Sequence, residues 1–105
     1  MNRRKYPRLP MRNACDGSWD VDGATFTGRM VNISAGGFAF ACTDTRFAES
    51  VGEQITIKIQ DFDVIRGKSL TGVIIRSTND EGTYIVGCRL LQDSTEILNY
   101  VHAKL

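Results

Sequence analysis

Residues 54–59 read QITIKI, a stretch in which every second position is an isoleucine. Ile55, Ile57 and Ile59 fall on one side of an extended chain, and the polar residues between them fall on the other. Such strict alternation predicts a strand with one face buried and the other in water, as in antiparallel sheets. The stretch therefore favours an antiparallel β-fold.

Similar stretches lie on both sides of this strand. Turn-forming residues separate them: DVDG at residues 20–23, SAGG at 34–37 and NDEG at 79–82. We expect the last turn to join a hairpin through about five residues, a common connection length. The further predicted strands cover residues 13–19, 24–33, 38–43, 69–77 and 83–91. Together with residues 54–59 they make six strands.

The end of the chain changes period. Asp93 is followed three residues later by Glu96, a variant of the capping box that begins helices. Apolar residues then recur at helical spacing, at Ile97, Leu98, Val101 and Leu105. We therefore predict a helix over about residues 93–105. The expected fold is mainly all-β, a six-stranded antiparallel barrel covered by one C-terminal α-helix.

The charge is unevenly distributed along the 105 residues, although the net charge is only +1. Residues 1–12 carry five basic residues and no acid, and the rest carry 8 bases and 12 acids. We predict a flexible basic arm over residues 1–12 and a single domain over 13–105. Such an arm suits a nucleotide, a nucleic acid, a membrane surface or an acidic protein. A solvated, disordered tail is the alternative.

The sequence lacks the residue combinations that several classes of function require. Three scattered cysteines and the single His102 do not form a zinc site, and no histidine is paired with a nucleophile. We therefore expect no metal, no cofactor and no enzyme activity. Scattered cysteines suit a reducing cytosol, and the apolar run at residues 38–42 is far shorter than the roughly 18 residues of a membrane helix. A cytoplasmic domain without a membrane span is expected.

Two stretches carry candidate binding residues. The first is RKYPR at residues 4–8, where Pro7 favours an extended conformation at Tyr6. In an extended chain Arg4 and Arg8 point to the same side, about 13 Å apart. Two guanidinium groups at this separation could bind both ends of an anionic ligand, through phosphates or the O6 and N7 atoms of guanine.

The second stretch is NISAGG at residues 32–37. Asn32 and Ser34 share a face and offer donors and acceptors, while Ile33 points to the core. Gly36 and Gly37 would allow a ligand to approach the backbone closely. The alternative is a polar turn that only closes a hairpin.

In this order and at this separation, the two motifs resemble those of the PilZ domain, R-x-x-x-R followed by [D/N]-x-S-x-x-G. Residues 84–90, YIVGCRL, are also similar to the last core strand of that family. The resemblance implies a six-stranded barrel with a C-terminal helix and a bacterial receptor for the second messenger cyclic di-GMP. It also implies an arm that becomes ordered when ligand binds and so signals to an effector protein. The implied ligand-binding residues are Arg3, Arg4, Arg8, Asn32, Ser34, Gly36 and Gly37.

The resemblance also bears on stoichiometry and on the rival functions. Cyclic di-GMP can bind such sites singly or as a stacked dimer, and the residue before R-x-x-x-R, here Arg3, implies two nucleotides per domain. The alternatives are a PilZ-like protein-interaction domain without nucleotide binding and a barrel that binds single-stranded nucleic acid. Dispersed aromatic residues, with Phe38 and Phe40 expected in the core, argue against nucleic acid.

Overall fold

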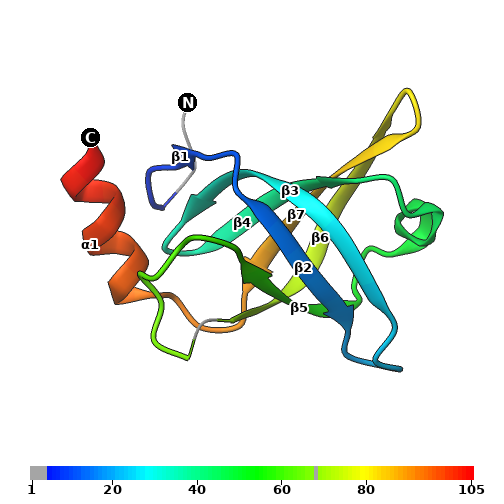
Figure 1. Cartoon of the computed structure of the whole chain (residues 1–105), viewed down its shortest axis with the longest axis horizontal. Coiled ribbons are helices and arrows are strands. Elements are labelled where there is room, and N and C mark those ends of the chain that lie inside the picture. Colours follow the sequence, from blue (N-terminus) through cyan, green and yellow to red (C-terminus); the bar gives the residue numbers. More distant parts are fainter. Residues whose placement is uncertain (1–4, 68) are drawn as a thin grey trace.

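The computed structural model describes residues 5–67 and 69–105, and in this part of the chain strands dominate (Figure 1). A 3₁₀-helix, η1, interrupts the strands, and one α-helix follows them. The elements are β1 (Leu9–Pro10), β2 (Ala14–Trp19), β3 (Thr25–Ser34), β4 (Gly37–Cys42), η1 (Thr45–Glu49), β5 (Gln54–Ile59), β6 (Leu70–Asp80), β7 (Thr83–Leu90) and α1 (Thr95–Lys104).

The strands β2 to β7 close into a six-stranded antiparallel barrel. They follow the order β3-β2-β5-β6-β7-β4, and β4 pairs again with β3 to close the circle. The two-residue strand β1 adds to β3 outside this circle. The helix α1 packs beside the barrel at its left in Figure 1. The predicted fold class, a six-stranded barrel with one C-terminal helix, is confirmed.

A cluster of aromatic rings lies among the aliphatic residues of the barrel interior. The rings of Trp19 and Phe47 lie 4.6 Å apart between centroids, and those of Phe26 and Phe40 lie 5.5 Å apart. Phe38 and Phe40 are buried, as expected from the sequence. Phe47 comes from η1, a segment without any strand pattern, yet it is fully buried. The Phe47 side chain of η1 therefore closes one end of the core.

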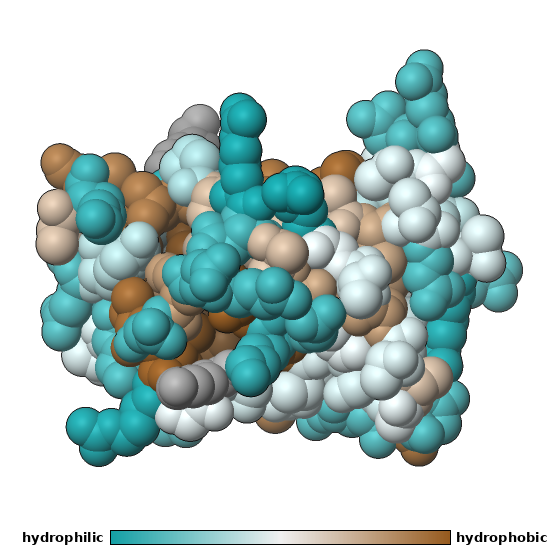
Figure 2. Space-filling view, viewed as in Figure 1, coloured by the Kyte–Doolittle hydropathy of each residue, from teal (hydrophilic) through white to brown (hydrophobic). Residues whose placement is uncertain are grey.

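The β6–β7 hairpin is longer and tighter than predicted. Pairing continues to Asp80 and Thr83, so only two residues connect the strands instead of about five. Glu81 and Gly82 both adopt positive φ, at 54° and 91°, which gives the backbone twist that two-residue hairpins favour. The extra strand residues are polar and carry the hairpin into solvent, where its tip is hydrophilic (Figures 1 and 2).

Helix α1 begins one residue later than the capping pattern indicated. Its N-cap is Ser94, whose hydroxyl accepts from the backbone N–H of Ile97, and not Asp93. The carboxylate of Glu96 instead accepts from the backbone N–H of Arg66. The predicted apolar stripe is correct for Ile97 and Val101 but wrong for Leu105, which is 71 % exposed at the end of the chain. Within the described residues no helix has the length and apolar character needed to cross a membrane.

Candidate functional site

Strand β3 contains a β-bulge that sets the orientation of Asn32. Met30 pairs with Phe40 and Asn32 with the next residue, Ala39, so Val31 is the additional residue of the bulge. Before the bulge the even-numbered Phe26 and Met30 point inward; after it the odd-numbered Ile33 does. Because the bulge reverses the alternation, Asn32 lies on the outer face of the barrel.

Strand β1 brings the described part of the arm to the same place. Leu9 pairs with Ile33 and Pro10 pairs with Asn32, while the N–H of Met11 donates to the carbonyl of Val31 in the bulge. Continuing this antiparallel register by one residue brings Arg8 level with Ser34. Residues far apart in the sequence therefore meet on one surface.

Tyr6 attaches the arm to the segment before helix α1. Its hydroxyl donates to a carboxylate oxygen of Asp93 at 2.7 Å, and the Nζ atom of Lys5 lies 3.4 Å from the same oxygen. The hydrogen bond from Tyr6, followed by Lys5, lowers the pKa of Asp93 below its ordinary value. The chain bends at Lys5 and Tyr6, so the predicted extended conformation does not hold there. This contact draws the backbone toward α1.

The NISAGG turn is held together by Ser34. Its hydroxyl accepts from the N–H of Gly36 at 3.3 Å and reaches the carbonyl of Gly37 at 3.4 Å. A side chain at Gly37 would collide with the carbonyl oxygen of Cys88, and one at Gly36 would press on the Tyr6 ring. The close approach at both glycines is therefore to the protein itself, to β7 and to the arm.

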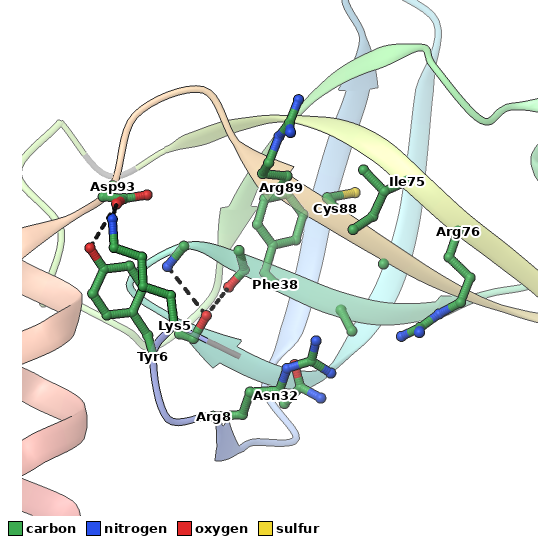
Figure 3. Close-up of a pocket in the computed structure, with 15 residues that line it drawn as sticks. Lys5, Tyr6, Arg8, Asn32, Phe38, Ile75, Arg76, Cys88, Arg89 and Asp93 are labelled. Carbon is green, nitrogen blue, oxygen red and sulfur yellow. Dashed lines mark hydrogen bonds and ion pairs between the residues drawn. The ribbon is translucent and has the colours of Figure 1, made fainter. Parts of the chain in front are cut away.

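These elements surround a cavity of about 390 Å³ on the outer face of the barrel (Figure 3). Tyr6 and Asp93 lie at one end of it, Arg76 at the opposite end, and Arg8 and Asn32 on one side between them. Its described lining includes four basic side chains, Lys5, Arg8, Arg76 and Arg89, and a single carboxylate, Asp93. Because Asp93 is already bound to Tyr6 and Lys5, the cavity suits an anionic ligand.

Cys88 is also among the residues that line the cavity, but its side chain belongs to the buried core. Burial raises the pKa of its thiol to about 12, so it is protonated at neutral pH and does not act as a nucleophile. All three cysteines are free and buried. They fill space in the core.

The cavity contains every predicted site residue that the structure describes: Arg8, Asn32, Ser34, Gly36 and Gly37. Arg3 and Arg4 lie outside the described residues. The sequence analysis missed Tyr6, Asp93, Arg76 and Gly87. Gly87 was the available signal, because a glycine inside a strand indicates a bulge or a close approach of other groups.

Three solved structures illustrate the similarity of the fold. The Bacillus subtilis inhibitor of motility MotI/DgrA matches 99 % of this chain and 52 % of its own, with 19 % identity and a TM-score of 0.75. The PilZ domain of Escherichia coli YcgR with c-di-GMP matches 96 % of this chain and 87 % of its own, with 17 % identity and a TM-score of 0.63. The K. pneumonia MrkH–c-di-GMP complex matches 99 % and 52 %, with 14 % identity and a TM-score of 0.69.

This chain thus spans about half the length of MotI/DgrA and of MrkH. At these identities the likeness shows the fold alone. No curated protein matches the sequence. The model of the PilZ domain family matches residues 2–103, nearly the whole chain, and this match establishes that the chain belongs to the PilZ domain family.

Proposed function

We propose that this domain is a receptor for cyclic di-GMP, which binds in the outer cavity. The observation that carries the proposal is the meeting of Arg8 with Asn32 and Ser34 around one cavity with an excess of positive charge. Cyclic di-GMP combines two phosphates with two guanine bases. The lining therefore offers cations for the phosphates and amide and hydroxyl groups for the base edges.

The residues divide into two kinds of contact. Arg8, with Arg3 and Arg4 from the part of the arm outside the described residues, would bind phosphates and guanine faces through planar guanidinium groups. Asn32 makes no side-chain hydrogen bond within the described residues, so its amide is available to a guanine edge. The hydroxyl oxygen of Ser34 accepts one hydrogen bond from the N–H of Gly36, and its second lone pair is available to the ligand. Gly36 and Gly37 add no side chains to the turn, so the turn does not project into the cavity.

Solved relatives support this ligand. The YcgR PilZ domain and MrkH, both similar to this chain in fold, have structures with c-di-GMP. Tyr6 and strand β1 already contact the rest of the domain. Binding would order the remainder of the arm (residues 1–12) over the cavity, and the reshaped arm surface would signal to an effector protein or fused domain. We also predict that ligand binding protects residues 1–10 from hydrogen exchange. Binding of the ligand as a stacked dimer, which Arg3 favours, is a prediction as well.

Calorimetric titration of the chain with cyclic di-GMP tests the proposal, because it measures affinity and stoichiometry together. We expect saturation at two nucleotides per chain, and one for Arg3→Leu. Arg8→Ala should weaken binding by about 1.5–3 kcal/mol, through loss of charge-assisted hydrogen bonds, without unfolding the barrel. A folded, unmodified chain that does not bind would instead support the alternative, a PilZ-like protein-interaction domain.

A further inference from the structure

Arg76 of β6 forms the side of the cavity opposite the arm (Figure 3). Its side chain is exposed, and it makes no ion pair or hydrogen bond with any residue in the described part of the chain. None of the motifs discussed above includes it. It is therefore a cation that faces the cavity without a protein partner there.

A second β-bulge sets the orientation of Arg76. Ile74 pairs with Cys88 and Arg76 with Gly87, so Ile75 is the additional residue, 55 % exposed. Without this bulge Arg76 would point into the barrel, because Leu70 and Ile74 point inward. The bulge in β6 thus turns Arg76 outward in the same way that the bulge in β3 turns Asn32 outward.

The two bulges lie in one row across the barrel face. Asn32 pairs with Ala39, Ala39 with Gly87, and Gly87 with Arg76. Three strand spacings separate the ends of this row, about 14 Å. Two small residues form its floor, so a flat ligand can lie between the amide at one end and the guanidinium at the other.

The floor also positions the guanidinium group. A Cβ atom built on Gly87 would lie 3.5 Å from one terminal nitrogen of Arg76 and 3.7 Å from its Nε atom. The arginine therefore lies over Gly87, in the space that a larger residue at this position would fill. Arg89, in the neighbouring row, also lines the cavity, but its guanidinium group points away from the floor in Figure 3.

We propose that Arg76 contacts a guanine base of the ligand and makes the cavity specific for guanine over adenine. This inference rests on the proposed function. A guanidinium group donates two parallel hydrogen bonds to the O6 and N7 acceptors of guanine, whereas adenine presents a donor at the N6 position. Its flat face can also stack on a base. The pairing with Asn32 across the row would orient the base between them.

Titrations with cyclic di-GMP and cyclic di-AMP test this proposal. We expect Arg76→Ala to weaken cyclic di-GMP binding roughly tenfold while changing cyclic di-AMP binding little, so that the preference for guanine falls. Arg76→Lys keeps the charge but not the planar fork, so it should bind cyclic di-GMP more weakly than the unmodified chain while keeping part of the preference for guanine. Lys58→Ala removes an equal charge from the outer face of β5, outside the cavity, and should change neither affinity.

Substitutions at Gly87 provide a second test that keeps the arginine. The Cβ of Gly87→Ala fits at ordinary contact distance, whereas the branched side chain of Gly87→Val displaces the guanidinium. We expect Gly87→Val to weaken cyclic di-GMP binding as Arg76→Ala does, and the double variant to be no weaker. Full additivity would mean that valine blocks the ligand directly and would count against the proposal.

The outcomes separate the two proposals. If the unmodified chain does not bind cyclic di-GMP, the proposed function and this inference both fail. If it binds and Arg8→Ala weakens binding, but Arg76→Ala binds with unchanged affinity and preference, only the inference about Arg76 fails. If Arg76→Ala weakens cyclic di-GMP and cyclic di-AMP binding equally, Arg76 acts as a simple charge on a phosphate, and the assignment to the base is overturned.

Discussion

The closed end of the barrel and the cavity face each present an arginine, and the two are used in opposite ways. At the closed end Arg46 lies 4.2 Å above the Trp19 ring and forms ion pairs with Asp22 at 2.9 Å and Glu53 at 3.5 Å. On the cavity face Arg76 lies over a glycine and has no ion-pair partner among the described residues. An arginine with its partners supplied by the fold stabilises the fold, and one without them is available to a ligand.

The largest expected effect concerns stability at the closed end. Phe47→Ala removes a fully buried ring that contacts Trp19, Phe26 and Phe40, and should lower the free energy of unfolding by about 3–5 kcal/mol. Urea denaturation measures the loss, and ligand affinity of the remaining folded protein should be unchanged. A comparable loss of affinity would show that the two regions are coupled.

Gly37→Ala should lower both the stability and the ligand affinity, because its new methyl group collides with the carbonyl of Cys88 in β7. We expect a loss of about 1–3 kcal/mol in unfolding free energy, the usual cost of overpacking, together with weaker cyclic di-GMP binding. Gly23→Ala in the β2–β3 turn, where the position is open but has φ of 76°, is a control for the backbone cost alone. Normal stability for Gly37→Ala would contradict the close approach of β4 and β7.

Arg46→Leu should have a smaller effect, confined to stability. It removes the cation above Trp19 and two partly exposed ion pairs, which together contribute about 1 kcal/mol. Thermal unfolding measures the shift, and part of it should disappear in high salt for the unmodified chain. The matched variant Arg76→Leu should leave the unfolding midpoint unchanged, and an equal shift would break the comparison between the two arginines.

The smallest expected effect is a pH dependence of the arm. The hydrogen bond from Tyr6 lowers the pKa of Asp93, so attachment of the arm is strongest above the ordinary aspartate range and is lost as the pH falls through the lowered pKa. In Tyr6→Phe the pKa of Asp93 should rise toward its ordinary value. NMR titration of the Asp93 carboxyl group measures its pKa in the unmodified chain and in Tyr6→Phe. Identical titration curves for the two proteins would refute the hydrogen bond from Tyr6 as the cause of the lowered pKa.

Much of the fold was predictable because local patterns and tertiary contacts agree. The alternation at Ile55, Ile57 and Ile59 is reproduced in β5, and the glycine at position 23 adopts the left-handed conformation expected of a turn. The helix boundary was less predictable because Asp93 and Ser94 are both good N-caps. Tyr6 engages Asp93, a contact across 87 residues, and Ser94 caps the helix.

The candidate site was predictable only in part. Motif spacing identified Arg8, Asn32, Ser34 and the two glycines, but it contained nothing about the opposite wall. Arg76 lies on a strand whose alternation is broken by Ile75, and Gly87 is covered by that arginine. Locally, Gly87 indicates only that other groups approach it closely, and Arg76 gives no sign of its role, because each role depends on the neighbour across the hairpin.

The sequence by itself determined the strand alternation, the turns, the terminal helix and the basic character of the arm, since these follow from side-chain polarity and backbone preference. The tertiary structure decided which side chains face the cavity. Val31 and Ile75 are bulged because of how β3 pairs with β4 and β6 with β7. One additional residue reverses the alternation of a strand, and cross-strand pairing selects where it lies. Asn32 and Arg76 are directed outward, into one cavity, for that reason.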